Sequence, residues 1–204
     1  MDTSIQHGSG VVLEPQIYLA SRSPRRVELL KQLGIRCQSL PADIDETALF
    51  NESPADYVIR LARQKAEACL ANLTPAQPIL PILAADTTVA LGSLILGKPV
   101  DDKDAKAMLK TLSGTKHEVH TAVALAFAGN IEVVLSTTIV EMMELTESQL
   151  DAYIATGEHL DKAGSYGIQG RAGAWIKRIE GSYTGVMGLP IYETMLLLSK
   201  SGFY

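Results

Sequence analysis

A near-continuous run of apolar residues over positions 79–91 constrains the fold of this chain more than any other segment. Strands with apolar side chains at nearly every position usually lie inside a sheet that is covered on both faces. Strand and helix patterns alternate along the rest of the chain, and they predict an α/β protein with a mixed central sheet flanked by helices. The run is interrupted at 85–88. Elsewhere the sequence predicts strands over 16–20, 35–40, 119–128, 131–143 and 175–179, and helices over 24–33, 54–70, 102–112, 146–156 and 191–199.

The composition limits the partners that such a fold can have. The chain has 204 residues, of which 47% are hydrophobic, enough for one large domain or for two lobes that share a core. A net charge of −5 argues against a nucleic-acid partner, because no basic field covers the molecule. No apolar run is long enough to span a membrane, so we expect no membrane partner.

The cysteines and the N-terminal segment favour a cytoplasmic protein. Cys37 and Cys69 lie within apolar patterns, which predicts reduced core residues and no disulfide. Residues 1–15 lack the pattern of a signal peptide and are expected to form a flexible leader. Residues 16–204 are then the folded domain.

The segment 21–26, Ser-Arg-Ser-Pro-Arg-Arg, ends the first strand and begins the first helix. A helix N-terminus carries partial positive charge, so Arg25 and Arg26 are unfavourable there in isolation. Together with the hydroxyls of Ser21 and Ser23 and the free backbone N–H groups, they predict a site for a multivalent anion, with phosphate first. The alternative is a pair of solvated arginines that bind nearby acids.

Asp86 is the strongest candidate for chemistry. It follows the apolar residues 79–85, at the expected end of a buried strand. A carboxylate is rarely buried unless it is paired or binds metal, and open α/β sheets bind ligands at the carboxyl ends of their strands. The alternative is a turn aspartate that accepts backbone hydrogen bonds.

An acidic loop provides candidate metal ligands. Asp43, Asp45 and Glu46 offer the oxygen atoms that Mg²⁺ prefers, although a solvated acidic turn is the commoner outcome. No cluster of histidine and cysteine suggests zinc. His117 and His120 are spaced to lie on opposite faces of a strand, so they do not form a ligand pair.

Two lysines and a glycine-rich segment complete the candidates. Lys65, on the polar side of the second helix, and Lys98, between Gly97 and a proline, are either phosphate-binding or surface lysines. Glycines over 163–170 permit close approach of the backbone to a ligand, and Gln169 has the donors and acceptor needed to contact a nucleobase edge. The alternative is a plain surface loop. No Walker or Rossmann glycine motif is present, which excludes a P-loop ATPase or an NAD enzyme on motif grounds.

Taken in order, these motifs resemble the Maf family from residue 17 to the last helix. The resemblance implies an α/β domain over 16–204 with two lobes and an active-site cleft between them, similar to inosine triphosphatases. It implies a cytoplasmic, homodimeric nucleoside triphosphate pyrophosphatase that uses Mg²⁺ or Mn²⁺, cleans nucleotide pools and is linked to inhibition of septum formation. The residues that carry it are Ser21-Arg22-Ser23-Pro24-Arg25-Arg26, Ala85-Asp86-Thr87, Gly97-Lys98-Pro99, Leu112-Ser113-Gly114 with His117, 163–170 and Gly188-Leu189-Pro190.

The resemblance also assigns roles to individual residues. Asp86 matches the proton acceptor that activates water, and Glu46 matches a carboxylate near the metal. We expect Glu46 and Asp86 to hold the metal ion in part, and the main role of Asp86 stays open between base and tight metal ligand. Arg25, Thr87 and Gln169 match the positions linked to substrate choice, in the combination of the branch that acts on dTTP and UTP. The positions that match groups holding the triphosphate are Ser21, Ser23, Arg25, Arg26, Lys65 and Lys98.

One departure and two alternatives stay open. Arg22 stands where the family usually has a small residue, which adds a charge at the mouth of the site. Within enzymes, the alternative is a pyrophosphatase for modified or purine nucleotides such as 7-methyl-GTP. Outside enzymes, it is a nucleotide-binding regulator of septum formation that needs no catalysis.

Overall fold

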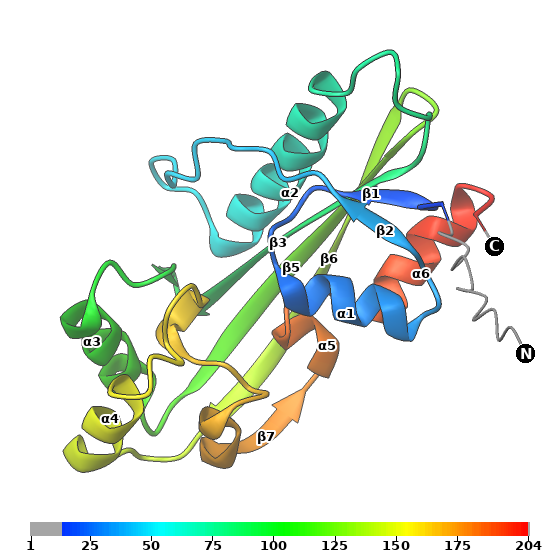
Figure 1. Ribbon diagram of the computed structural model, residues 1–204. Helices are drawn as coiled ribbons and strands as arrows, with labels where there is room; N and C mark the ends of the chain where they lie inside the picture. The colour runs from blue at the N-terminus through cyan, green and yellow to red at the C-terminus, as the bar shows by residue number, and fades with distance from the viewer. Residues whose placement is uncertain (1–13, 204) are drawn as a thin grey trace, which may run out of the picture.

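The structure, a computed structural model that describes residues 14–203, is a seven-stranded mixed sheet with helices on both faces (Figure 1). The strand order is β2-β1-β3-β5-β6-β7, and β4 pairs with β3 outside this path. β1 is parallel to β2 and β3, whereas the other pairs are antiparallel. The predicted fold class is therefore confirmed. The strands are β1 (Ile17–Leu19), β2 (Cys37–Ser39), β3 (Ile82–Leu91), β4 (Leu94–Leu96), β5 (Lys116–Phe127), β6 (Asn130–Met142) and β7 (Ile176–Glu180).

The helices begin where the sequence places their caps. The side chains of Ser53 and Asp101 accept hydrogen bonds from the first turns of α2 and α3, and Thr146 forms a capping box with Gln149 on α4. The short elements β4, α5 and two 3₁₀ turns (Ala163–Ser165 and Arg171–Trp175) were not predicted. The helices are α1 (Pro24–Gln32), α2 (Pro54–Ala71), α3 (Asp102–Leu112), α4 (Glu147–Ile154), α5 (Tyr183–Val186) and α6 (Ile191–Lys200).

The side chains of β3 alternate between two helical layers. Ile82 and Ala84 pack with the buried face of α2, whereas Leu83 and Ala85 pack with α1 and α6 on the other face. This double coverage explains why the first half of the strand is apolar at every position. Further along the same strand, Val89 packs into a separate core that α3 and α4 cover. The long central strands thus connect two groups of helices, one at each end of the sheet (Figure 1).

The prediction that β3 ends at Asp86 is wrong. The strand continues to Leu91, and Asp86 pairs with Ala122 of β5 in an unbroken antiparallel ladder. A ladder is made by backbone groups, so the polar side chains at 86–88 do not interrupt it. The side chains at 86–88 lie between the cores that α1, α2 and α6 cover and the core that α3 and α4 cover.

The cysteine prediction is partly corrected. Both thiols are free, as expected, and Cys69 is buried, but Cys37 is only half-buried because β2 is an edge strand. Burial raises the pKa of both thiols. Most of the predicted leader lies outside the described residues. Within residues 14–203, no helix has both the length and the apolar character of a membrane span.

His117 makes the stability of this fold depend on pH. The side chain is 2% exposed, its Nε2 lies 2.7 Å from the Tyr166 hydroxyl, and burial lowers its pKa to about 4. In the unfolded chain the pKa is about 6.5, so that state binds the proton first as the pH falls. We expect this residue to cost up to about 3 kcal/mol of stability between pH 6.5 and pH 4.

Urea unfolding of the wild type and of His117→Phe at several pH values between 7 and 4 checks this expectation. The variant lacks the titrating group and is expected to lose less stability over this interval. Equal pH dependence in the two proteins would show that His117 does not carry the effect.

Candidate active site

A cavity of about 510 Å³ lies between the two groups of helices. Its walls come from the start of α1, the loop after β2, the middle of β3 and the glycine-rich segment that follows α4. A cavity of this size accommodates a nucleotide-sized ligand. Every residue to which the resemblance assigns a role lines it, although these residues are distant in sequence: Ser21, Ser23, Arg25, Arg26, Glu46, Lys65, Asp86, Thr87, Lys98 and Gln169.

Asp86 contributes a buried carboxylate to this cavity. The residue is 7% exposed, and its even position on β3 turns the side chain toward α2, as for Ile82 and Ala84. There its Oδ1 accepts a hydrogen bond of 2.6 Å from Lys65 Nζ. Burial raises the pKa of the Asp86 carboxyl above its ordinary value, against the opposing effects of Lys65 and Arg26. A carboxylate with a raised pKa is better suited to accept a proton.

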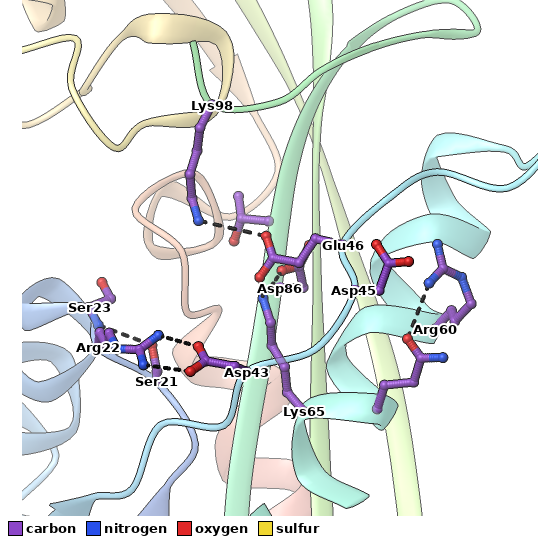
Figure 2. Close-up of polar contacts among 12 residues, drawn as sticks. Ser21, Arg22, Ser23, Asp43, Asp45, Glu46, Arg60, Lys65, Asp86 and Lys98 are labelled. Atoms are coloured by element: carbon purple, nitrogen blue, oxygen red, sulfur yellow. Dashed lines mark hydrogen bonds and ion pairs between the residues drawn. The ribbon is translucent and has the colours of Figure 1, made fainter. Parts of the chain in front are cut away.

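Glu46 contacts the same ammonium group (Figure 2). Its Oε1 lies 2.7 Å from Lys65 Nζ, and its Oε2 lies 3.7 Å from Lys98 Nζ. Partial burial acts to raise the pKa of Glu46, but the two lysines outweigh it and hold the pKa below its ordinary value. The Tyr57 hydroxyl donates to the Glu46 backbone carbonyl at 2.9 Å, which fixes this part of the loop on α2.

The rest of the acidic loop does not join Glu46. Asp43 forms a two-bond ion pair with Arg22, at 2.7 and 3.1 Å, so the extra charge at the cavity mouth is matched locally. Asp45 accepts from the Thr47 backbone N–H at 2.9 Å. The loop therefore directs the side chains of Asp43 and Asp45 to other partners, and only Glu46 of its three acids points to the lysines of the cavity.

The donor set that remains is small but suits magnesium. No group of three or more His, Cys, Asp or Glu side chains within residues 14–203 has a metal-binding arrangement. Glu46 and Asp86, however, direct carboxylate oxygens to one cation, the Lys65 ammonium. Mg²⁺ commonly binds through one or two carboxylates, with waters and substrate phosphates as its other ligands. These two residues therefore fit a divalent ion that arrives with a phosphorylated substrate.

The start of α1 has free donors. Its first N–H groups have no intrahelical partner, and the Ser23 side chain at the N-cap position caps none of them. The Ser21 hydroxyl instead accepts from the Ser23 backbone N–H at 3.1 Å and from Arg26 Nη1 at 3.0 Å. This arrangement leaves the helix end open to an anion in the cavity.

Arg26 connects three elements beneath that helix end. Its Nε donates to the Gly188 carbonyl at 2.7 Å, and its Nη2 donates to the Thr87 hydroxyl at 3.3 Å. Burial lowers the pKa of Arg26, but an arginine keeps its charge in proteins. The guanidinium is thus a fixed positive charge beside Thr87, with its orientation set by the protein.

Gly164 of the glycine-rich segment packs closely against a strand. A Cβ added to this residue would lie 2.9 Å from the Val89 side chain, and its N–H donates to the Gly97 carbonyl at 3.0 Å. The close approach is therefore to β3, not to a ligand. Gln169, in contrast, is exposed and lines the cavity.

Sequence reasoning missed two cavity residues. Lys162 is half-buried, and burial together with the charge of Arg25 lowers its pKa. Thr88 is 1% exposed, and its hydroxyl has no hydrogen-bond partner among the described residues. Its position two residues after Asp86 on one strand was a usable sign, because such residues share a face.

Comparisons with known proteins find similar sequences over most of the chain. The model of a family described as "Maf-like protein" matches residues 16–201. A protein of Methylobacillus flagellatus named dTTP/UTP pyrophosphatase is 56% identical over 187 residues, covering 92% of this chain and 93% of that protein. A protein of Nitrosomonas europaea with the same name is 53% identical over 195 residues, covering 91% and 94%. Among solved structures, the Ham1 protein of Staphylococcus aureus matches with a TM-score of 0.46 at 14% identity, covering 63% of this chain and 72% of that one.

Proposed function

The chain belongs to the Maf family, and from this premise we propose that it hydrolyses dTTP and UTP to the nucleoside monophosphate and pyrophosphate. The observation that carries the proposal is the buried Asp86 carboxylate in a nucleotide-sized cavity whose walls hold lysines and arginines. Relatives whose alignments cover more than nine-tenths of this chain bear the name of this activity. The enzyme thereby cleans nucleotide pools.

The phosphates bind at the start of α1. The free N–H groups of the first helical turn donate to phosphate oxygens, with the hydroxyls of Ser21 and Ser23 beside them. The side chains of Arg25 and Arg26 add positive charge on one side, and Lys98 adds it across the cavity. These groups stabilise the charge that develops on the leaving pyrophosphate.

Three residues of the same cavity recognise the base. Gln169 has an amide that both donates and accepts, which suits the edge of uracil or thymine. Thr87 offers a hydroxyl that Arg26 holds in place, and Arg25 completes the set.

Asp86 acts as the general base. It orients a water molecule and accepts its proton while the water oxygen bonds to the α-phosphorus. The bond from that phosphorus to the bridging oxygen breaks, and its electron pair leaves with pyrophosphate. Glu46 and Asp86 are the residues that would hold Mg²⁺ or Mn²⁺, which when bound neutralises phosphate charge.

Pyrophosphate release from dTTP, UTP, CTP, GTP, 7-methyl-GTP and ATP, each with Mg²⁺ and with EDTA, tests this function. We expect dTTP and UTP to lead and EDTA to abolish release. Release led by 7-methyl-GTP or a purine would reject the base-recognition residues while keeping the phosphate site. Nucleotide binding without any release would favour the regulator of septum formation. The homodimer and the cytoplasmic location stay predictions.

A further inference from the structure

Lys65 lies where a bound cation would be expected. Its Nζ lies 2.6 Å from Asp86 Oδ1 and 2.7 Å from Glu46 Oε1, so the two carboxylates share one ammonium (Figure 2). The Lys65 side chain is 12% exposed and that of Asp86 is 10% exposed, so water screens this contact weakly. The same two carboxylates are the oxygen ligands that fit the divalent ion.

The backbone beneath Lys65 is fixed, whereas its side chain can rotate. Val58, Leu61, Ala62 and Ala66 of α2 are fully buried against the sheet, so the helix has no room to shift. A lysine has a flexible four-carbon stem with a compact charge at its end. The only route by which the Lys65 ammonium can leave the carboxylates is therefore rotation of its side chain within the cavity.

We propose that Lys65 is an internal counter-cation that exchanges with the divalent metal ion. In the substrate-free enzyme its ammonium occupies the position between Glu46 and Asp86, and a metal ion must displace it because two cations repel at this distance. The displaced ammonium then turns to the substrate phosphates. This inference rests on the proposed function, because that function is the reason that a metal ion and a triphosphate bind in this cavity together.

The exchange predicts that metal and triphosphate favour each other's binding through Lys65. Without nucleotide, the ammonium competes with the metal for the two carboxylates. With nucleotide, the phosphates offer the ammonium another partner and so release the carboxylates. Such coupling is reciprocal, because each ligand raises the affinity for the other by the same factor.

Calorimetric titration of the full chain with Mn²⁺ at pH 8, without nucleotide, tests the competition. Lys65→Met is expected to bind Mn²⁺ at least about tenfold more tightly than the wild type, within the usual range of such coupling. Lys98→Met is the matched control, because Lys98 lies 3.7 Å from Glu46 and its side chain is 60% exposed. Its affinity is expected to change by less than about threefold. Equal or weaker Mn²⁺ binding by Lys65→Met would overturn the proposal.

The first arm of a second measurement uses the wild type and needs no variant. The non-hydrolysable analogue α,β-methylene-dTTP is expected to raise the Mn²⁺ affinity of the wild type, and Lys65→Gln, where it folds, is expected to lose about tenfold of that gain. A wild type whose Mn²⁺ affinity is unchanged by the analogue would contradict the exchange. The titration without nucleotide involves no hydrolysis, so a failure of the proposed activity and a failure of this inference are distinguishable.

Discussion

Replacing Asp86 with asparagine is expected to lower the turnover of dTTP at least about a hundredfold, the low end for loss of a general base. Asparagine keeps the size of the side chain and its ability to accept from Lys65, which still pairs with Glu46. It removes the site that accepts the proton of the attacking water. The measurement is the kcat for pyrophosphate release, together with binding of α,β-methylene-dTTP.

The matched control is Asp43→Asn, at the rim of the same cavity. Asp43 is exposed and pairs with Arg22, so its loss is expected to change turnover by no more than a few-fold. Near-normal turnover of Asp86→Asn would reject Asp86 as the base. Loss of turnover in both variants would indicate a general electrostatic effect of removing acids from the cavity.

Replacing Gly164 with alanine is expected to lower the free energy of unfolding by about 3 kcal/mol. The residue has φ +66°, which an L side chain adopts only with strain, and the added Cβ would lie 2.9 Å from Val89 Cβ. Val89 is 3% exposed and β-branched, so it has little freedom to move aside. The overlap forces the glycine-rich segment and β3 apart, and both line the cavity. We therefore also expect weaker nucleotide binding.

Gly129→Ala provides the control for this prediction. Gly129 has φ +80° in the turn between β5 and β6, and an added Cβ there meets nothing within 4 Å. Its substitution carries only the conformational cost, about 1 kcal/mol. Urea unfolding of both variants gives the comparison. Equal destabilisation would show that the contact with Val89 adds nothing.

Local features of the fold were predictable because they depend on neighbouring residues. The cap residues Ser53, Asp101 and Thr146 fixed the starts of three helices, since a side chain satisfies the N–H groups just after it. The length of β3 was not predictable in this way. Its ladder depends on β5, a strand distant in sequence that pairs Asp86 with Ala122. Polar side chains at 86–88 therefore suggested an end of the strand that pairing with β5 overrides.

The sequence predicted which residues form the site, but not which of them contact one another. A carboxylate after an apolar run implied that Asp86 is buried, and it is. That Lys65 joins it to Glu46, and that Gly164 contacts Val89, depend on contacts between distant segments, which no local pattern contains. The roles of Arg25, Thr87 and Gln169 in substrate choice come from the resemblance and stay predictions.

The most direct test of the central claim is the fate of the water oxygen when the purified chain hydrolyses dTTP in ¹⁸O-labelled water with Mg²⁺. Attack on the α-phosphorus with Asp86 as base predicts ¹⁸O in dTMP and unlabelled pyrophosphate by mass spectrometry. Label in pyrophosphate would place the attack on the β-phosphorus, and labelled orthophosphate with dTDP would place it on the γ-phosphorus. Either result would contradict the proposed reaction.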